Sequence, residues 1–103
     1  MQISVVGPPS LSAEQIRAYA EYKLFSRLMT LGRGVCDIQA VVTAHLPDAQ
    51  ATCTVAVDLG EAGCVRTRVR RTGAVPAVDA AVETVARAAS RRLARFKAKE
   101  TVT

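Results

Sequence analysis

The sequence contains no tryptophan, a single histidine and only four aromatic side chains. Its three cysteines, Cys36, Cys53 and Cys64, form no Cys-x-x-Cys pair, and His45 is the one histidine that can join them. This scarcity argues against a zinc site and against a disulfide framework, so we expect no bound metal. We expect instead that all three cysteines are small, half-buried residues of strands.

Catalytic motifs are also missing, because the sequence has no glycine-rich phosphate loop, no nucleophile elbow and no metal-ligand spacing. His45 stands at the end of a predicted strand, where a hydrogen-bonded or exposed strand residue is its expected role. Asp37, His45 and Asp58 can share one sheet face, as many polar strand residues do. The sequence therefore predicts no enzyme, no cofactor and no small-molecule substrate.

Long apolar runs are absent too. No run approaches the roughly 18 residues of a membrane span, and no charged-then-apolar leader opens the chain. We therefore expect a cytoplasmic protein with no membrane partner. A length of 103 residues, half of them apolar, predicts one folded domain. We expect this domain to cover residues 1–99 and a flexible tail to cover residues 100–103.

Positive charge is concentrated in the second half of the chain. Ten of the fourteen Lys and Arg residues lie between Cys64 and Lys99, together with only two acids, whereas residues 1–63 hold four basic and six acidic residues. Such an asymmetry between halves favours a polyanionic partner.

The stretch from Ala77 to Lys99 is predicted to be an amphipathic helix. At 100° per residue, one face gathers apolar side chains, namely Val78, Val82, Val85, Ala89, Leu93 and Phe96. Arg87, Arg91 and Arg95, which we call the arginine ridge, lie within about 80° of one another on another face. Arg92 and Lys99 join them on its flank. Asp79 and Glu83 lie in the first two turns, where the helix dipole favours acids.

The rest of the chain predicts an α+β domain of order β-α-β-β-β-α. Apolar and polar residues alternate in four predicted strands, 2–6, 35–46, 50–59 and 64–71. Ser12 and Gln15 predict a capping box for a helix that runs to about Leu31, where Gly32 and Gly34 end it. Turns are predicted at Pro47-Asp48-Ala49 and at residues 60–63. We expect a mostly antiparallel four-stranded sheet with both helices side by side on one face.

The last strand adds a second set of positive charges, since Arg66, Arg68 and Arg70 alternate outward and Arg71 follows. Lys and Arg contacts to phosphates give affinity without sequence specificity, and duplex RNA is read largely by shape. Most of the four aromatic residues, Tyr19, Tyr22, Phe25 and Phe96, resemble core residues, so a base-stacking platform is not expected. A general duplex-RNA- or DNA-binding domain and a ribosome-assembly module therefore stay open as alternatives.

Two segments resemble the bacterial ribosome hibernation-promoting factors, also called ribosome-associated translation inhibitors. The opening Met1-Gln2-Ile3 and the residues around the first helix fit this family, namely Gly7, Glu14, Ile16, Arg17, Tyr19, Ala20, Glu21, Lys23 and Leu24. Ala77-Val78-Asp79 stands where the family has Ala-Ile-Asp, and the arginine ridge occupies basic positions of its final helix. The likeness covers nearly the whole chain and fits the short, single-domain form.

The resemblance implies a protein of stressed or stationary cells that sits on the small ribosomal subunit. In that family the domain occupies the cleft where messenger and the A- and P-site transfer RNAs lie, and it silences idle ribosomes. The basic faces of both helices touch ribosomal RNA. By position, these contacts fall on Lys23, Arg27, Arg87, Arg91 and Arg95.

Overall fold

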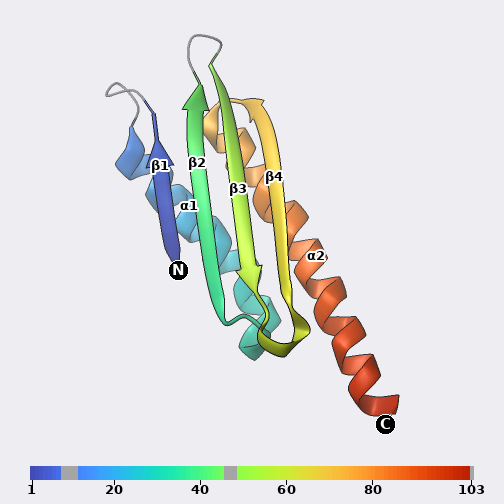
Figure 1. Ribbon diagram of the computed structural model, residues 1–103. Coiled ribbons are helices and arrows are strands. Elements are labelled where there is room, and N and C mark those ends of the chain that lie inside the picture. Colours follow the sequence, from blue (N-terminus) through green and yellow to red (C-terminus); the bar gives the residue numbers. More distant parts are fainter. Residues whose placement is uncertain (8–11, 46–48, 103) are drawn as a thin grey trace.

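The computed structural model describes residues 1–7, 12–45 and 49–102 (Figure 1). Its elements are β1 (Gln2–Val6), α1 (Ala13–Leu28), the 3-10 helix η1 (Met29–Gly34), β2 (Asp37–His45), β3 (Gln50–Asp58), the 3-10 helix η2 (Gly60–Ala62), β4 (Cys64–Thr72) and α2 (Ala74–Val102). The predicted order β-α-β-β-β-α is therefore confirmed.

The four strands form one mixed sheet in the order β1-β2-β3-β4. β1 and β2 are parallel, because α1 carries the chain back to the same end of the sheet before β2 begins. The other two ladders are antiparallel hairpins, so the sheet is mostly antiparallel, as predicted. Its register places Val42 beside Val5 on one side and Cys53 on the other.

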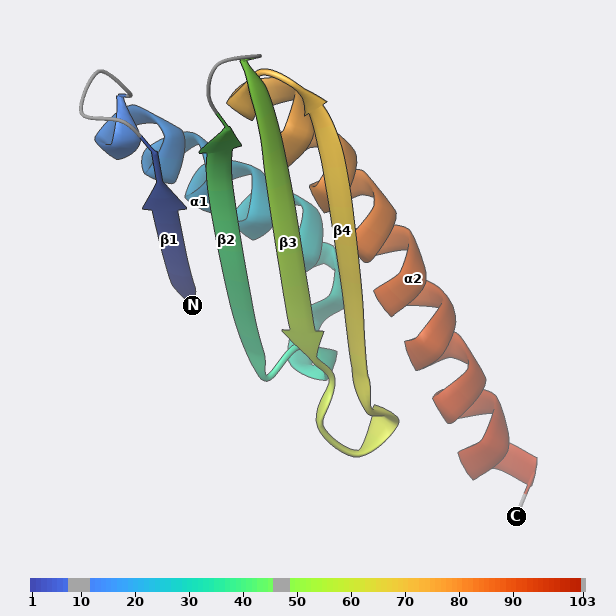
Figure 2. The same cartoon turned by 45° about the horizontal axis from the view of Figure 1, so that its top comes forward.

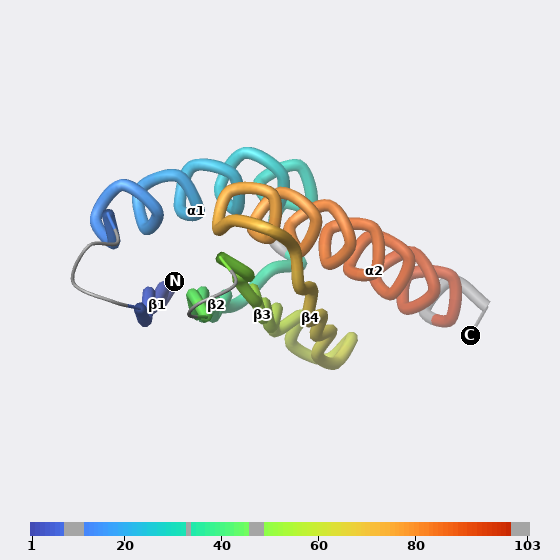
Figure 3. The backbone as a smooth tube through the Cα atoms, turned by 90° about the horizontal axis from the view of Figure 1, so that it is seen from above, coloured from blue at the N-terminus to red at the C-terminus, as the bar shows by residue number. Residues whose placement is uncertain are grey.

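Both helices cover the same face of this sheet and leave the opposite face bare, as the views in Figures 2 and 3 show. The core lies between the helices and the sheet. Its largest fully buried side chains come from α1, β2, β3 and α2, namely Leu24, Val42, Val55, Val57, Val78, Val82, Val85 and Cys53. The predicted apolar face of α2 is thus confirmed, although Leu93 and Phe96 at its far end are only half-buried.

The helix ends differ in detail from the predicted ones. α1 begins after Ser12, but the Ser12 side chain makes no capping hydrogen bond, so the predicted capping box is wrong. The α-helical part ends at Leu28, and η1 continues to the glycines, with Gly32 at a φ of 62°. Pro76 lies in the first turn of α2, where its missing N–H removes no intrahelical hydrogen bond.

α2 begins at Ala74, continues past the predicted end at Lys99 and reaches Val102. With 29 residues it is about 44 Å long, whereas a nine-residue strand spans about 30 Å. Its C-terminal end therefore projects beyond the sheet (Figure 1). None of the helices in the described ranges is long and apolar enough to cross a membrane.

The turn at residues 47–48, and with it the end of the second strand at Leu46, lies outside the described residues. The interpretation of the cysteines is wrong for two of the three, because Cys53 is buried but Cys36 and Cys64 are exposed. Cys36 lies just before β2, and Cys64 begins β4 on the bare face of the sheet, where neither helix covers it.

Candidate nucleic-acid interface

Ion pairs join the two helices along their line of contact. Lys23 Nζ of α1 lies 3.5 Å from Asp79 Oδ1 of α2, and Arg27 Nη2 donates to Glu83 Oε2 at 2.9 Å. The Tyr19 hydroxyl also donates to Asp79 Oδ1, which raises the pKa of Tyr19, with burial and the carboxylate charge as lesser causes. Asp79 and Glu83 of α2 thus have basic partners on α1. Because α2 begins at Ala74, neither acid lies in its first turn, and the predicted stabilisation by the helix dipole is wrong.

The arginine ridge has no such partners. Arg87, Arg91 and Arg95 are exposed, and no carboxylate of the described side chains lies within ion-pair distance of them. The reason is geometric: α1 ends at Leu28, close to the turn of α2 that carries Glu83, and α2 has no further acid before Lys99. The charge of the helix layer therefore rises along α2, from nearly neutral at Asp79 to strongly positive at Arg95.

Arg27 and Arg87 both lie where the nearly neutral part of the helix layer borders the strongly positive part. Together with Thr30 and Ser90 they line a hollow of about 190 Å³ between the end of α1 and α2. Guanidinium and hydroxyl groups are the side chains that commonly bind phosphate oxygens. This hollow is a candidate phosphate subsite, and within it Arg87 is the guanidinium without a carboxylate partner among the described residues.

The remaining predicted contact residues do not share one surface. Arg92 lies toward the β3–β4 turn, since a Cβ atom placed on Gly63 would stand 3.1 Å from Arg92 Nη1. Lys99 is exposed on the projecting end of α2. Arg66, Arg68 and Arg70 are exposed on the bare face of the sheet, the side opposite the helices. Arg71 alternates to the helix-facing side, where its Nη1 donates to the Arg70 carbonyl at 2.8 Å.

Two aromatic residues of α1 are exposed, which corrects the expectation that most of the aromatics belong to the core. Tyr22 is 68% exposed and Phe25 is 57% exposed, whereas Tyr19 and Phe96 are half-buried against the core. The sequence did hold a signal for this. Tyr22, Phe25 and Met29 follow the i, i+3, i+7 spacing of a second apolar stripe, and one helix can turn only one stripe to the sheet.

His45 lies far from Asp37 and Asp58, the other polar strand residues that can share its sheet face. Asp37 and Asp58 are neighbours in the register, but His45 lies eight residues further along β2, about 26 Å away. His45 Nε2 is instead 2.9 Å from the Thr52 hydroxyl, which confirms the expected hydrogen-bonded strand residue.

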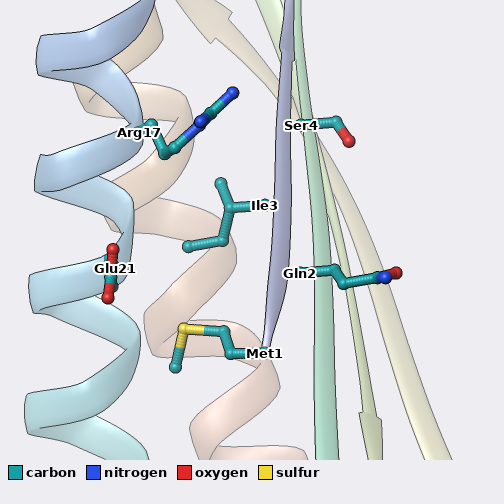
Figure 4. Close-up of a pocket in the computed structure, with 6 residues that line it drawn as sticks. All are labelled: Met1, Gln2, Ile3, Ser4, Arg17 and Glu21. Atoms are coloured by element: carbon teal, nitrogen blue, oxygen red, sulfur yellow. The ribbon is translucent and has the colours of Figure 1, made fainter.

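A larger hollow of about 470 Å³ lies between β1 and α1 (Figure 4). Arg17 and Glu21 line it from α1, while Met1 and Ile3 point toward the helix and Gln2 and Ser4 point away to the bare face. This hollow carries one basic and one acidic side chain, so it has little net charge to attract an anion. The cationic part of the helix layer lies on the other side of α1, at α2.

Two solved structures share this fold over nearly their full length. The N-terminal domain of Protein Y from Thermus thermophilus aligns with 88% of this chain and 98% of its own, at a TM-score of 0.65 and 28% identity. A ribosomal subunit interface protein from Coxiella burnetii aligns with 91% of this chain and 99% of its own, at a TM-score of 0.70 and 16% identity. Both are proteins of the hibernation-promoting factor family.

The chain thus resembles the hibernation-promoting factor family. The 28% identity extends this likeness from the fold to the sequence, and the predicted resemblance is confirmed. The Coxiella protein, at 16% identity, supports the fold alone. No protein-family model and no curated protein sequence matches this chain.

Proposed function

We propose that this protein is a ribosome-associated hibernation factor that inhibits translation by binding small-subunit ribosomal RNA near the messenger and the A and P transfer-RNA sites. The observation that carries the proposal is the exposed arginine ridge, which has no acidic partner among the described residues, on a domain with the fold of a ribosomal subunit interface protein. The role is one of binding rather than catalysis, in the cytoplasm of stressed cells.

The proposed contact residues differ in whether a carboxylate already neutralises their positive charge. Neighbouring arginines of the ridge are four residues apart, about 6 Å along the helix axis, so all three can face one phosphate-lined surface. Lys23 and Arg27 contribute less, because each already holds a carboxylate of α2. Arg92 and Lys99 add positive charge near the arginine ridge. Arg92 lies toward the β3–β4 turn, and Lys99 lies near the C-terminal end of α2.

Charge reversal tests this assignment. We expect the triple variant Arg87→Glu, Arg91→Glu, Arg95→Glu to fold as the parent does, because changes of exposed residues usually cost within about 0.5 kcal/mol. It should no longer co-sediment with purified small subunits in a sucrose gradient. The parent protein should co-sediment, and transfer RNA bound to the subunit should compete with it.

The matched control reverses three arginines on the other side of the sheet, Arg66, Arg68 and Arg70. This variant has the same net charge as the ridge variant, so it should lose only the long-range attraction, an effect that fades at high salt. If the strand variant loses subunit binding while the ridge variant keeps it, the protein uses the bare face of its sheet, and the proposed interface is wrong.

The cationic strand also favours a second candidate function, that of a general duplex-RNA- or DNA-binding domain or a ribosome-assembly module. Arg66, Arg68 and Arg70 give the molecule a positive surface that the helix interface does not need. Such a protein would bind free duplex RNA as tightly as it binds small subunits. A competition between free duplex RNA and subunits therefore separates the two functions.

A further inference from the structure

The outer face of α1 carries an exposed aromatic stripe, which we define as Tyr22, Phe25 and Met29. Their side chains are 68%, 57% and 59% exposed, and they lie within about 60° of one another on the helix. This direction is roughly 150° away from that of the buried residues of α1, so the stripe faces outward from the sheet. Packing of the core therefore does not explain it.

The size of the stripe argues against a second copy of the chain as its partner. An aromatic side chain buries about 150–250 Å², so three side chains that are each somewhat over half exposed offer roughly 300 Å². A stable protein interface needs about 800 Å² from each partner. The charged residues around the stripe cannot supply the rest as an apolar surface, since Arg17 and Glu21 flank it on the β1 side and Lys23 and Arg27 on the α2 side.

The stripe and the arginine ridge belong to the same layer of the molecule. α1 and α2 are in contact along the ion pairs described above, and both lie on one side of the sheet (Figure 3). Exposed aromatic rings beside a line of cations are the combination that binds unpaired nucleic acid, with bases on the rings and phosphates on the cations. A duplex, by contrast, offers its phosphates but keeps its base faces stacked inside.

We propose that Tyr22 and Phe25 are stacking residues for unpaired bases of the same RNA whose phosphates the arginine ridge holds. This inference rests on the proposed function and narrows its ligand to RNA with splayed or single-stranded nucleotides. Phe25 and Met29 also border a hollow of about 220 Å³ beside β2, which leaves open space next to the Phe25 ring. Glu21 on the β1 side repels phosphates, so the RNA backbone runs from the stripe toward α2.

Salt titration distinguishes stacking from phosphate contacts. The probes are a single-stranded RNA of about 12 nucleotides and an RNA duplex of the same length, within the range of sites that single-strand binders occupy. We expect Tyr22→Ala and Phe25→Ala each to weaken single-strand binding by about 5- to 150-fold, without a change in the slope of log affinity against log salt. Duplex binding should stay the same, and Tyr22→Phe should bind as the parent does.

A control variant and a fluorescence signal both check the stacking role independently. Val41→Ala truncates an exposed apolar residue on the bare face of the sheet, and it should leave both probes unaffected. Because the chain lacks tryptophan and has only two tyrosines, its fluorescence comes from Tyr19 and Tyr22. Stacking should quench the Tyr22 emission on addition of the single strand, and Tyr22→Phe removes that signal while it retains binding.

The outcomes separate this inference from the proposed function. If Tyr22→Ala and Phe25→Ala bind the single strand and the small subunit as the parent does while the ridge variant fails, the stacking role is wrong and the proposed function stands. If the ridge variant also binds subunits normally, the proposed function fails as well. A parent protein that sediments as a dimer, and a Phe25→Ala variant that sediments as a monomer, would assign the stripe to self-association and overturn the inference.

Discussion

The ion pairs between the helices allow a variant that should bind RNA more tightly than the natural chain. Asp79→Asn combined with Glu83→Gln removes two negative charges, so Lys23 and Arg27 lose their ion pairs and their charges are free to attract phosphates. Both new side chains keep an amide oxygen, so Tyr19 and Arg27 retain an acceptor. The paired side chains are 32–44% exposed, so each lost pair should cost only about 0.2–1 kcal/mol of stability.

The gain in binding follows from counterion release. Each phosphate contact contributes about 0.7–0.9 to the slope of log affinity against log salt, so two released cations should steepen this slope by roughly 1.4–1.8. Over a change from about 50 to 200 mM salt, each added contact alters the affinity about threefold. The assay is fluorescence anisotropy of labelled small-subunit RNA across this salt range, together with a thermal melt that checks the fold.

Long-range attraction is controlled by a variant with the same change of charge. Glu21→Gln combined with Glu61→Gln also removes two acids, but these side chains pair with no basic residue of the described chain. It should raise affinity at low salt while the slope changes little. If the Asp79 and Glu83 variant shows the parent's slope, Lys23 and Arg27 do not contact phosphates, and the charge grading of the helix layer is wrong.

Two further predictions concern the core and the thiols. Phe96 is half-buried, so Phe96→Ala should lower the free energy of unfolding by roughly half of the 3–5 kcal/mol that a fully buried phenylalanine costs. Chemical denaturation should show a smaller loss of stability for this variant than for Leu24→Ala, because the Leu24 side chain is only 1% exposed. A Phe96 loss equal to or above that of Leu24 would contradict this ranking. Cys36 and Cys64 are exposed, whereas burial raises the pKa of the Cys53 thiol to about 11. Because the thiolate is the reactive form, a thiol reagent at about pH 8 should modify Cys36 and Cys64 in the folded protein and Cys53 only after unfolding. Three fast-reacting thiols in the folded protein would contradict the burial of Cys53.

The strand and core predictions succeeded because alternation is a local property. Val55 and Val57 are two residues apart, next to Thr54 and Asp58, and that period of two places both valines on one side of β3, the buried side. The same rule places Cys64 in phase with Arg66, on the bare face, so the sequence held the signal that contradicts a half-buried Cys64. The parallel pairing of β1 is also a consequence of the helix that follows it.

The contacts between α1 and α2 could not be predicted from local patterns in the sequence. Tyr19 and Asp79 are sixty residues apart, and their pairing depends on the relative position and rotation of α1 and α2. Helical periodicity fixes which side of each helix is apolar, but it does not fix which charges face each other across the two. The family resemblance grouped Lys23 and Arg27 with the arginine ridge by position, whereas the structure gives Lys23 and Arg27 acidic partners.

The projecting end of α2 determines how this molecule can approach a narrow cleft. An α-helix with its side chains is about 10–12 Å across, whereas the whole domain measures 54 × 20 × 16 Å. The 3-10 turns η1 and η2 lie beside Leu93, Phe96 and Lys97 of α2, so Arg95 lies level with the body of the domain. Lys99 lies on the part of α2 that extends past these turns, where the helix alone presents positive charge. The difference in length between one helix and the sheet beneath it thus sets how far the positive charges can reach.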